Sequence, residues 1–413
     1  MNKEFFINNR KKLIDGLPDN SILILYSGSA EYWSGDESHK FSISKDFYYI
    51  TGLEEENYIY FYQKSINPLE VLFIEKDNDE KFIKFFGHKK SKEEVYQTTD
   101  IENIDYTDEF EAFFEAFIEN SKYTSIIDIY LDMINSNSNF NIKLQQIMNK
   151  LLNNINYHNI DIDFSNLRAI KQEGEIRNIK KAIDITHKGI QHIFKNAKNC
   201  KYENEIEALY DYEIKVEGIY EKAFHSIVAS GENAAILHYS KNNSKMCKDD
   251  LVLLDLGVRY ENYCSDISRT FPLNGYFNDR QKVLYNIVLN TQIETMNSVK
   301  VGMTFKELNN VTKNSLIRQL KEINLIDKDE EVEKYYYHSV SHPLGLDTHD
   351  CRGHTQKIAE GMVITIEPGL YIEEESIGIR IEDDILVTKD GYINLSENIP
   401  KEIEDIEKIM RNS

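Results

Sequence analysis

The sequence has little of what marks several classes of protein. It contains only 4 cysteines and 6 prolines. No CxxC pair occurs among the cysteines, so a disulfide scaffold and a zinc ribbon are excluded, and we expect reduced, buried thiols. With 18 glycines and no internal repeat, fibrous and low-complexity chains are excluded too. The cysteines are Cys200, Cys247, Cys264 and Cys351.

The chain also lacks an excess of positive charge. Lys plus Arg is 48 against 70 for Asp plus Glu, which gives a formal net charge of −22. A nucleic-acid binder needs a basic face, and docking on an anionic membrane needs one as well, so neither partner is expected.

Long hydrophobic runs are missing as well. The longest apolar pieces, such as Ile22–Leu25 and Leu251–Leu254, have the length of strands, whereas a membrane helix needs about 18 apolar residues. The N-terminus, MNKEFFINNRKK, has no apolar stretch of the kind that a signal peptide carries. We expect a cytoplasmic protein.

What the chain does have is length and a large apolar fraction. Its 413 residues predict two to three domains at roughly 150 residues each. Hydrophobic residues make up 41% of the sequence, which is enough for sizeable cores. We place the domains at residues 1–164 and 165–413, with residues 168–175 as a charged connection.

The first domain is predicted to be α/β. No catalytic constellation is evident in it, because its histidines, His39, His88 and His158, are isolated in the sequence. Short apolar runs bounded by turn residues predict strands, and apolar residues at helical spacing predict helices. The predicted strands are Ser21–Tyr26, Phe47–Ile50, Tyr58–Tyr62 and Leu69–Glu75, and the predicted helices are Asp108–Asn120 and residues 141–153.

The second domain is predicted to be α+β. Isoleucines from Ile176 to Ile193 recur on one helical stripe, with His187 and His192 off the stripe and expected in solvent. Further helices are predicted at Glu203–Glu217, ended by Gly218, and at Asp279–Val299.

Two aspartates lie in β-rich runs that flank a predicted hairpin loop. If the loop is centred between Tyr260 and Glu261, Asp255 stands directly opposite Asp266. Two such carboxylates would be about 5 Å apart and would repel each other, unless a shared cation binds both. A register slip of one residue would instead place them on opposite faces of the sheet.

Two glutamates repeat this pattern. An apolar strand, Met362–Glu367, ends on Glu367, and Gly378–Val387 carries Glu382 in its centre. Buried carboxylates are rarely left unpaired, so both indicate a partner. For the second strand the alternatives are an ion pair of Glu382 with Arg380 and exposure of Asp383 and Asp384 at a sheet edge.

Histidines gather near these carboxylates in the sequence. His338 and His342 are four residues apart, but the Pro-Leu-Gly that follows argues against a helix. We predict His342 as a metal ligand, with the other clustered histidines lining the site. The cluster consists of His225, His238, His338, His342, His349 and His354.

Four carboxylates and one imidazole form a hard, oxygen-rich ligand set. It suits Mn²⁺, and Co²⁺, Fe²⁺ or Zn²⁺ are alternatives. Five protein ligands are more than one hydrolytic ion needs, so two divalent ions about 3.5–4 Å apart are predicted. The set is Asp255, Asp266, His342, Glu367 and Glu382.

These residues, in this order, resemble the metal signature of the pita-bread metallopeptidases, which include methionine aminopeptidase, aminopeptidase P and prolidase. Several short sequence stretches are similar to those of bacterial aminopeptidase P, the Xaa-Pro aminopeptidases, and the resemblance covers nearly the whole chain. It implies an α/β N-terminal domain followed by an α+β pita-bread (creatinase/aminopeptidase) catalytic domain. The stretches that carry it are Arg10–Leu17, Phe47–Gly52, Asn233–Tyr239, Ser341–Asp350 and Ile366–Tyr371.

The resemblance also implies roles for single residues. Asp266 and Glu382 would bridge two ions, Asp255 would hold the first, and His342 and Glu367 would hold the second. Glu367 would also move the proton of the attacking water. His349 would contact the scissile carbonyl or its oxyanion, His238 and His338 would line the substrate site, and Arg380 would support the ligands.

The implied activity is release of the residue that precedes proline at a peptide N-terminus, by a homo-oligomer. An Xaa-Pro dipeptidase is the alternative, and a peptide-binding module that has lost its metal ligands is a third. Pro343, the pair Cys351-Arg352 and the pair Ser44-Lys45 depart from the family pattern. These departures concern pocket detail and substrate preference rather than the ligands.

Overall fold

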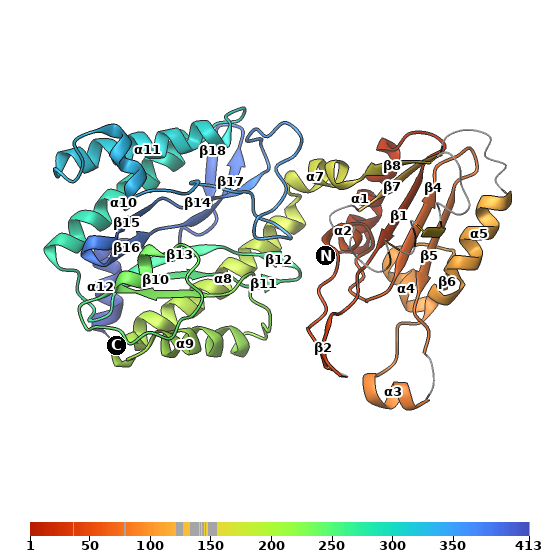
Figure 1. Cartoon of the computed structure of the whole chain (residues 1–413), viewed down its shortest axis with the longest axis horizontal. Helices are drawn as coiled ribbons and strands as arrows, with labels where there is room; N and C mark the ends of the chain where they lie inside the picture. Colours follow the sequence, from red (N-terminus) through yellow and green to blue (C-terminus); the bar gives the residue numbers. More distant parts are fainter. Residues whose placement is uncertain are drawn as a thin grey trace. The chain divides into compact units, whose positions relative to one another are not determined.

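The computed structural model describes residues 1–35, 37–77, 80–120, 127–132, 140, 142, 144, 146–147 and 155–412. The chain divides into two compact units, Met1–Leu167 and Arg168–Ser413, and the division falls inside helix α7, Asp161–Ala169. Figure 1 shows the elements of both. None of the helices in the described ranges is long and apolar enough to span a membrane.

A mixed six-stranded sheet with the order β6-β5-β4-β1-β7-β8 forms the centre of the first unit. β1 pairs antiparallel with β4 and parallel with β7. The strands of this sheet are β1 (Ile22–Tyr26), β4 (Ile59–Gln63), β5 (Leu69–Ile74), β6 (Ile104–Tyr106), β7 (Ile127–Leu131) and β8 (Ile155–Asn159). A separate hairpin joins β2 (Tyr32–Ser34) to β3 (Glu37–Ser38).

Aromatic residues of helix α5 (Phe110–Asn120) pack on this sheet. Phe61 of β4 meets Phe113 and Phe117, and Phe73 of β5 meets Phe110, with ring centroids 5.1–5.2 Å apart. The other helices of this unit are α1 (Lys3–Gly16), α2 (Lys45–Thr51), α3 (Glu80–Phe86) and α4 (Lys92–Thr99).

The prediction of a strand at Phe47–Ile50 is wrong, because these residues belong to α2. Ser44 accepts a hydrogen bond from the Phe47 amide at the start of this helix. Gly52 ends it with a left-handed φ of 71°. A cap at each end outweighs the β preference of a short aromatic run. The helix predicted over 141–153 lies largely outside the described residues.

Two groups of helices and several small sheets build the second unit. α8 (Glu173–Asn196) confirms the isoleucine stripe, and it packs on α9 (Glu203–Val216) and α12 (Ile403–Arg411). α10 (Asp279–Ser298) contacts β14, β15 and β16, and packs on α11 (Phe305–Glu322). The strands are β9 (Ile227–Ser230), β10 (Leu251–Leu256), β11 (Arg259–Tyr260), β12 (Tyr263–Cys264), β13 (Ile267–Pro272), β14 (Val363–Ile366), β15 (Gly369–Ile372), β16 (Ile377–Arg380), β17 (Asp383–Thr388) and β18 (Gly391–Asn394).

The hairpin differs from its predicted register. Tyr260 stands opposite Tyr263, and Asp255 stands opposite Ser268 rather than Asp266. The turn consists of Glu261 and Asn262, both with left-handed φ values of 49° and 66°. Such a pair suits the two-residue turn that matches the twist of antiparallel strands, and this turn lies one residue later than predicted.

The run predicted as one strand at Gly378–Val387 is two strands. β16 pairs with β15, whereas β17 pairs with β14 and β18, so the chain changes sheets at Ile381 and Glu382. Asp383 and Asp384 are fully buried in the central strand β17, which contradicts exposure at an edge. Asp383 is neutralised by ion pairs with Arg269 and Lys401.

The predicted connection at 168–175 contains the break between α7 and α8, at residues 170–172, and its Arg168 and Lys171 side chains are buried. Two smaller expectations are corrected. His187 is half-buried and His192 pairs with Glu213, so neither is simply solvated. None of the four cysteines, all of which lie in the described ranges, forms a disulfide, and Cys264 alone among them is buried.

Candidate active site

A cavity of about 520 Å³ lies in the second unit. Carboxylates, imidazoles and arginines dominate its lining, although this unit has strongly apolar strands. Every residue predicted for the site borders it, namely Asp255, Asp266, Glu367, Glu382, His238, His338, His342, His349 and Arg380. His225 and His354, which were expected to join the cluster, lie outside the lining.

Strand ends position the four carboxylates. Asp255 lies near the end of β10, and Asp266 directly precedes β13. Glu367 directly follows β14, and Glu382 lies where the chain passes from β16 to β17. Asp255 is paired on both sides within its sheet, whereas the other three lie at or next to strand ends, and all four border the cavity.

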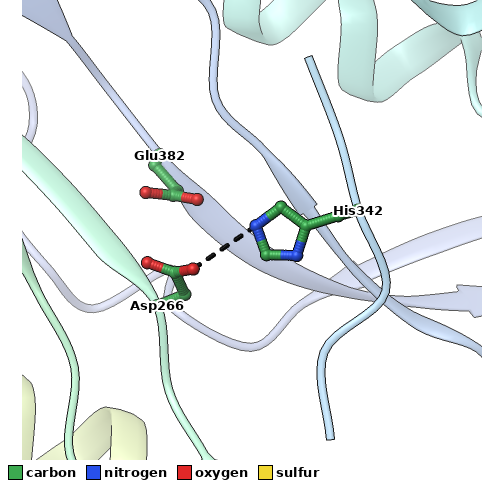
Figure 2. A group of neighbouring side chains, drawn as sticks. All are labelled: Asp266, His342 and Glu382. Carbon is green, nitrogen blue, oxygen red and sulfur yellow. Dashed lines mark ion pairs between the residues drawn. The ribbon is translucent and has the colours of Figure 1, made fainter. Parts of the chain in front are cut away.

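Three of the side chains are close enough to hold one ion. Asp266, His342 and Glu382 each offer a ligand atom, and these atoms lie within 4.8 Å of one another. Figure 2 shows the two carboxylates and the imidazole pointing toward one another, from different segments of the chain.

The His342 ring is oriented as a metal-binding imidazole would be. Its Nδ1 lies 3.0 Å from the Pro343 carbonyl, which can only accept, so Nδ1 donates. Nε2 then faces Asp266 and Glu367, with N–O distances of 3.4 and 3.5 Å. Two ligand atoms bound to one ion at about 2.1 Å, at a tetrahedral angle, are about 3.4 Å apart.

Electrostatics also favour a cation at this position. Burial, followed by the neighbouring carboxylates, raises the pKa of Asp266 and of Glu382 well above the ordinary range. Burial likewise raises the pKa of Glu367. Oδ1 of Asp255 is buried with no hydrogen-bond partner among the described residues. A divalent ion would relieve the repulsion and satisfy this oxygen, so the residues present fit a metal.

Arg380 spans the wall of the cavity behind these ligands. Its guanidinium donates to Asp255 Oδ2 at 2.6 Å, to the Ser268 hydroxyl at 2.8 Å and to the Tyr371 hydroxyl at 3.0 Å. The Ser268 hydroxyl in turn donates to Glu382 at 2.8 Å. The ion pair predicted between Arg380 and Glu382 is therefore replaced by one with Asp255.

His338 is held as a neutral imidazole. Nδ1 donates to the Ser339 carbonyl, and Nε2 accepts from the Tyr371 hydroxyl, both at 2.9 Å. Burial, with the nearby Arg380 charge, lowers the pKa of His338 to about 4. Burial raises the pKa of Tyr371 to about 12, so this hydroxyl keeps its proton.

His349 contacts the predicted ligand His342 at the cavity. Their ring centroids are 4.2 Å apart in an edge-on arrangement. Burial, together with His342, lowers the pKa of His349, which favours the neutral ring at neutral pH. The adjacent Asp350 is buried and accepts from Arg168 at 2.6 Å and from Lys171 at 3.0 Å.

Sequence reasoning assigned no role to Ser268 or Tyr371. Ser268 lies two residues after Asp266, and this period-2 spacing, which places both side chains on one face of a strand, was the signal that could have identified it. Tyr371 closes the stretch Ile366–Tyr371, but nothing in its spacing shows that it meets His338 and Arg380.

Two family models match the chain. One is described as metallopeptidase family M24 and matches residues 177–389. The other is described as the aminopeptidase P N-terminal domain and matches residues 6–127.

Individual proteins are similar over nearly the full chain. It is 30% identical over 431 residues to the Xaa-Pro aminopeptidase of Haemophilus influenzae, covering 99% of this chain and 97% of that relative. It is 30% identical over 436 residues to intermediate cleaving peptidase 55 of Saccharomyces cerevisiae, covering 98% and 84%.

Solved structures agree with these matches. A Bacillus anthracis structure described as a candidate aminopeptidase P has a TM-score of 0.94 at 44% identity, covering 100% of this chain and 99% of its own. A variant of Escherichia coli aminopeptidase P in complex with substrate has a TM-score of 0.91 at 25% identity, with the same coverage. The predicted fold class, an α/β domain followed by an α+β pita-bread domain, is confirmed.

Proposed function

Because the chain belongs to metallopeptidase family M24, we propose that it is a metal-dependent exopeptidase that releases the N-terminal residue from peptides with proline in the second position. The observation that carries the proposal is the cavity that His342 shares with four carboxylates, two of them buried and two partly exposed. The Xaa-Pro aminopeptidase relative, similar over both units, supports this substrate class. We keep residues 1–164 as the N-terminal domain and 165–413 as the catalytic domain.

We assign two divalent ions, Mn²⁺ first, to this cavity. The ligands would be Asp255, Asp266, His342, Glu367 and Glu382, because their oxygens and one nitrogen form the hard donor set that Mn²⁺ prefers. When bound, such ions supply Lewis-acid chemistry, since they lower the pKa of a water molecule and polarise the scissile carbonyl.

The chain's own residues would perform the remaining steps. Glu367, with its raised pKa, takes up the proton that the attacking water loses. His349, at the rim of the cavity, donates a hydrogen bond to the oxygen on which negative charge develops. His238 and His338 line the substrate position, and Arg380 fixes the orientation of Asp255.

The remaining assignments are proposals of the same kind. We propose a cytoplasmic homo-oligomer that acts on peptides and binds neither nucleic acid nor membrane. The net charge of −22 supports the last two points.

A matched set of peptides tests the function. The metal-loaded protein should release the first residue from Xaa-Pro-Yaa tripeptides and longer peptides. Cleavage of Xaa-Pro dipeptides alone would establish the dipeptidase instead. An Xaa-Ala-Yaa peptide belongs in the set as the control for proline, and cleavage of that peptide alone would contradict the preference for proline.

Metal analysis tests the ligands. Asp266→Asn should lose activity and bind less metal, while its circular dichroism spectrum stays unchanged. Near-normal turnover in this variant would show that the ligand assignment is wrong.

A further inference from the structure

One buried carboxylate outside the cavity, Glu203, has an unusual set of partners. Glu203, the first residue of α9, is fully buried. In the described part of the chain its partners are all neutral. It accepts five hydrogen bonds, at 2.7–2.9 Å. The donors are the Ser230 amide and hydroxyl, the Asn233 side-chain amide, the Tyr239 hydroxyl and the Ser244 amide.

All five donors belong to one segment of the chain. This segment, residues 230–244, leaves β9, forms a short 3-10 helix at Gly231–Ala235 and passes the cavity at Leu237 and His238. Glu203 binds the segment on both sides of His238. The Tyr239 hydroxyl, one residue from His238, makes the shortest of the five bonds, at 2.7 Å.

Glu207, four residues further along the same helix, holds the segment again. It accepts from the Asn242 side-chain amide at 3.0 Å. Asn242 also donates to the Ser226 carbonyl at 2.8 Å and accepts from the Val228 amide at 3.0 Å. Residues four apart share one face of a helix, so a single face of α9 holds the whole segment.

In the described structure, few other contacts fix the position of the His238 side chain. Its side chain is exposed at the cavity. The neighbouring backbone packs tightly, because a Cβ atom on Gly378 of β16 would lie 2.1 Å from the Ala234 carbonyl oxygen. The position of the His238 ring therefore follows from where the backbone of the segment is held.

We propose that Glu203 is a positioning residue for His238. Its carboxylate fixes the 230–244 segment at the depth and angle at which the imidazole faces the cavity. The inference rests on the proposed function, since it requires His238 to contact substrate. Glu203 itself does not line the cavity and contacts no substrate.

A purely structural role for Glu203 predicts a different kinetic result. In that case its loss would lower stability or activity by the same factor whether or not His238 is present. A positioning role predicts that the loss of activity depends on His238, because nothing remains to be positioned once the imidazole is gone.

A double-mutant cycle separates the two roles. Glu203→Gln keeps the shape of the side chain but places an amide N–H against groups that donate hydrogen bonds to the carboxylate in the wild type. We expect kcat/KM to fall about 10- to 100-fold in the wild-type background. In the His238→Ala background it should fall less than about 2-fold. Equal factors in both backgrounds would overturn the proposal.

Two further variants keep the cycle interpretable. Tyr239→Phe removes one hydrogen-bond donor to Glu203 and preserves the ring, so it replaces Glu203→Gln if that variant does not fold. We expect kcat/KM to fall about 2- to 10-fold, and this loss should again depend on His238. Glu205→Gln is the matched control on the same helix turn. Its side chain binds the amides of Lys201 and Tyr202 rather than the segment, and its turnover should match the wild type.

Hydrogen exchange gives a readout that needs no activity. Amides of residues 230–244 should exchange faster in Glu203→Gln and not in Glu205→Gln. Unchanged exchange of this segment would refute the contact on which the proposal depends. An inactive wild-type protein would refute the proposed function, while the exchange result would still decide whether Glu203 holds the segment.

Discussion

Asp350→Asn is predicted to destabilise the second unit strongly. Asp350 is shared by two cations that are themselves buried, since the exposed side-chain fractions are 6% for Arg168, 1% for Lys171 and 1% for Asp350. Asparagine has the same shape, which matters because the site is tight: a Cβ on Gly345 would lie 2.1 Å from Asp350 Oδ2. The substitution therefore removes the charge and replaces one of the two acceptor oxygens by an N–H donor, at nearly unchanged shape.

The magnitude follows from the partners that remain. Arg168 keeps an ion pair with Asp347, which is 43% exposed, at 2.6 Å. Lys171 keeps no second ion pair in the described structure; the buried Glu175 still interacts with it electrostatically, but no carboxylate contacts the buried ammonium. Breaking such a buried pair costs about 3–5 kcal/mol. Adding Lys171→Met removes the unpaired charge, and it should restore about 1–3 kcal/mol of this loss.

The assay must report on the second unit by itself. The sequence contains a single tryptophan, Trp33 of β2, which lies in the first unit and is 63% exposed, so its fluorescence does not report on the second unit. Native-state hydrogen exchange of α8 and of residues 343–350, in denaturant, measures the stability of the second. A loss below about 1 kcal/mol, or a double variant no more stable than Asp350→Asn, would refute the reasoning.

Four further predictions follow from the site. Lys171 and Arg168 lower the pKa of Asp350 despite its burial. The stability that the ionised Asp350 contributes is therefore full above about pH 4 and is lost as pH falls through the lowered pKa. Acid unfolding of Asp350→Asn compared with the wild type measures this loss. Chelation should lower the melting temperature of the second unit but leave hydrogen exchange in the sheet of the first unit unchanged. Metal affinity by calorimetry should rise with pH, because Asp266 and Glu382 must lose protons from raised pKa values. Exposed Cys247 should react with iodoacetamide at pH 8, whereas buried Cys264, with its pKa raised to about 11, should not.

Much of the site could be predicted from the sequence because a charged side chain inside an apolar strand needs a partner. This reasoning identified Asp255 in the buried strand β10, and Glu367 and Glu382 directly beside the buried strands β14 and β17. The isoleucine periodicity of α8 was equally informative, since a long amphipathic helix is determined by local spacing.

What could not be predicted depends on contacts between distant segments. Asp383 and Asp384 have the same local pattern as Glu382, but Arg269 and Lys401 neutralise Asp383, while Asp384 accepts from the Asp266 amide. Nothing in their own strand distinguishes these partners from a metal or from solvent.

Short-range features were missed for a different reason. The α2 helix is decided by its caps at Ser44 and Gly52, which outweigh the aromatic composition between them. The hairpin register is decided by whether the two turn residues tolerate positive φ, and Glu261 gave no sign that it does.

The hairpin has a consequence for how the protein folds. Its two-residue turn is among the most local contacts of the second unit, and such contacts form early. It therefore brings Asp255 and Asp266 together before His342, Glu367 and Glu382, which come from much later in the chain, can reach them. Because salt screens repulsion between like charges, refolding of the second unit should accelerate as ionic strength rises, and Asp266→Asn should remove much of that acceleration in stopped-flow measurements.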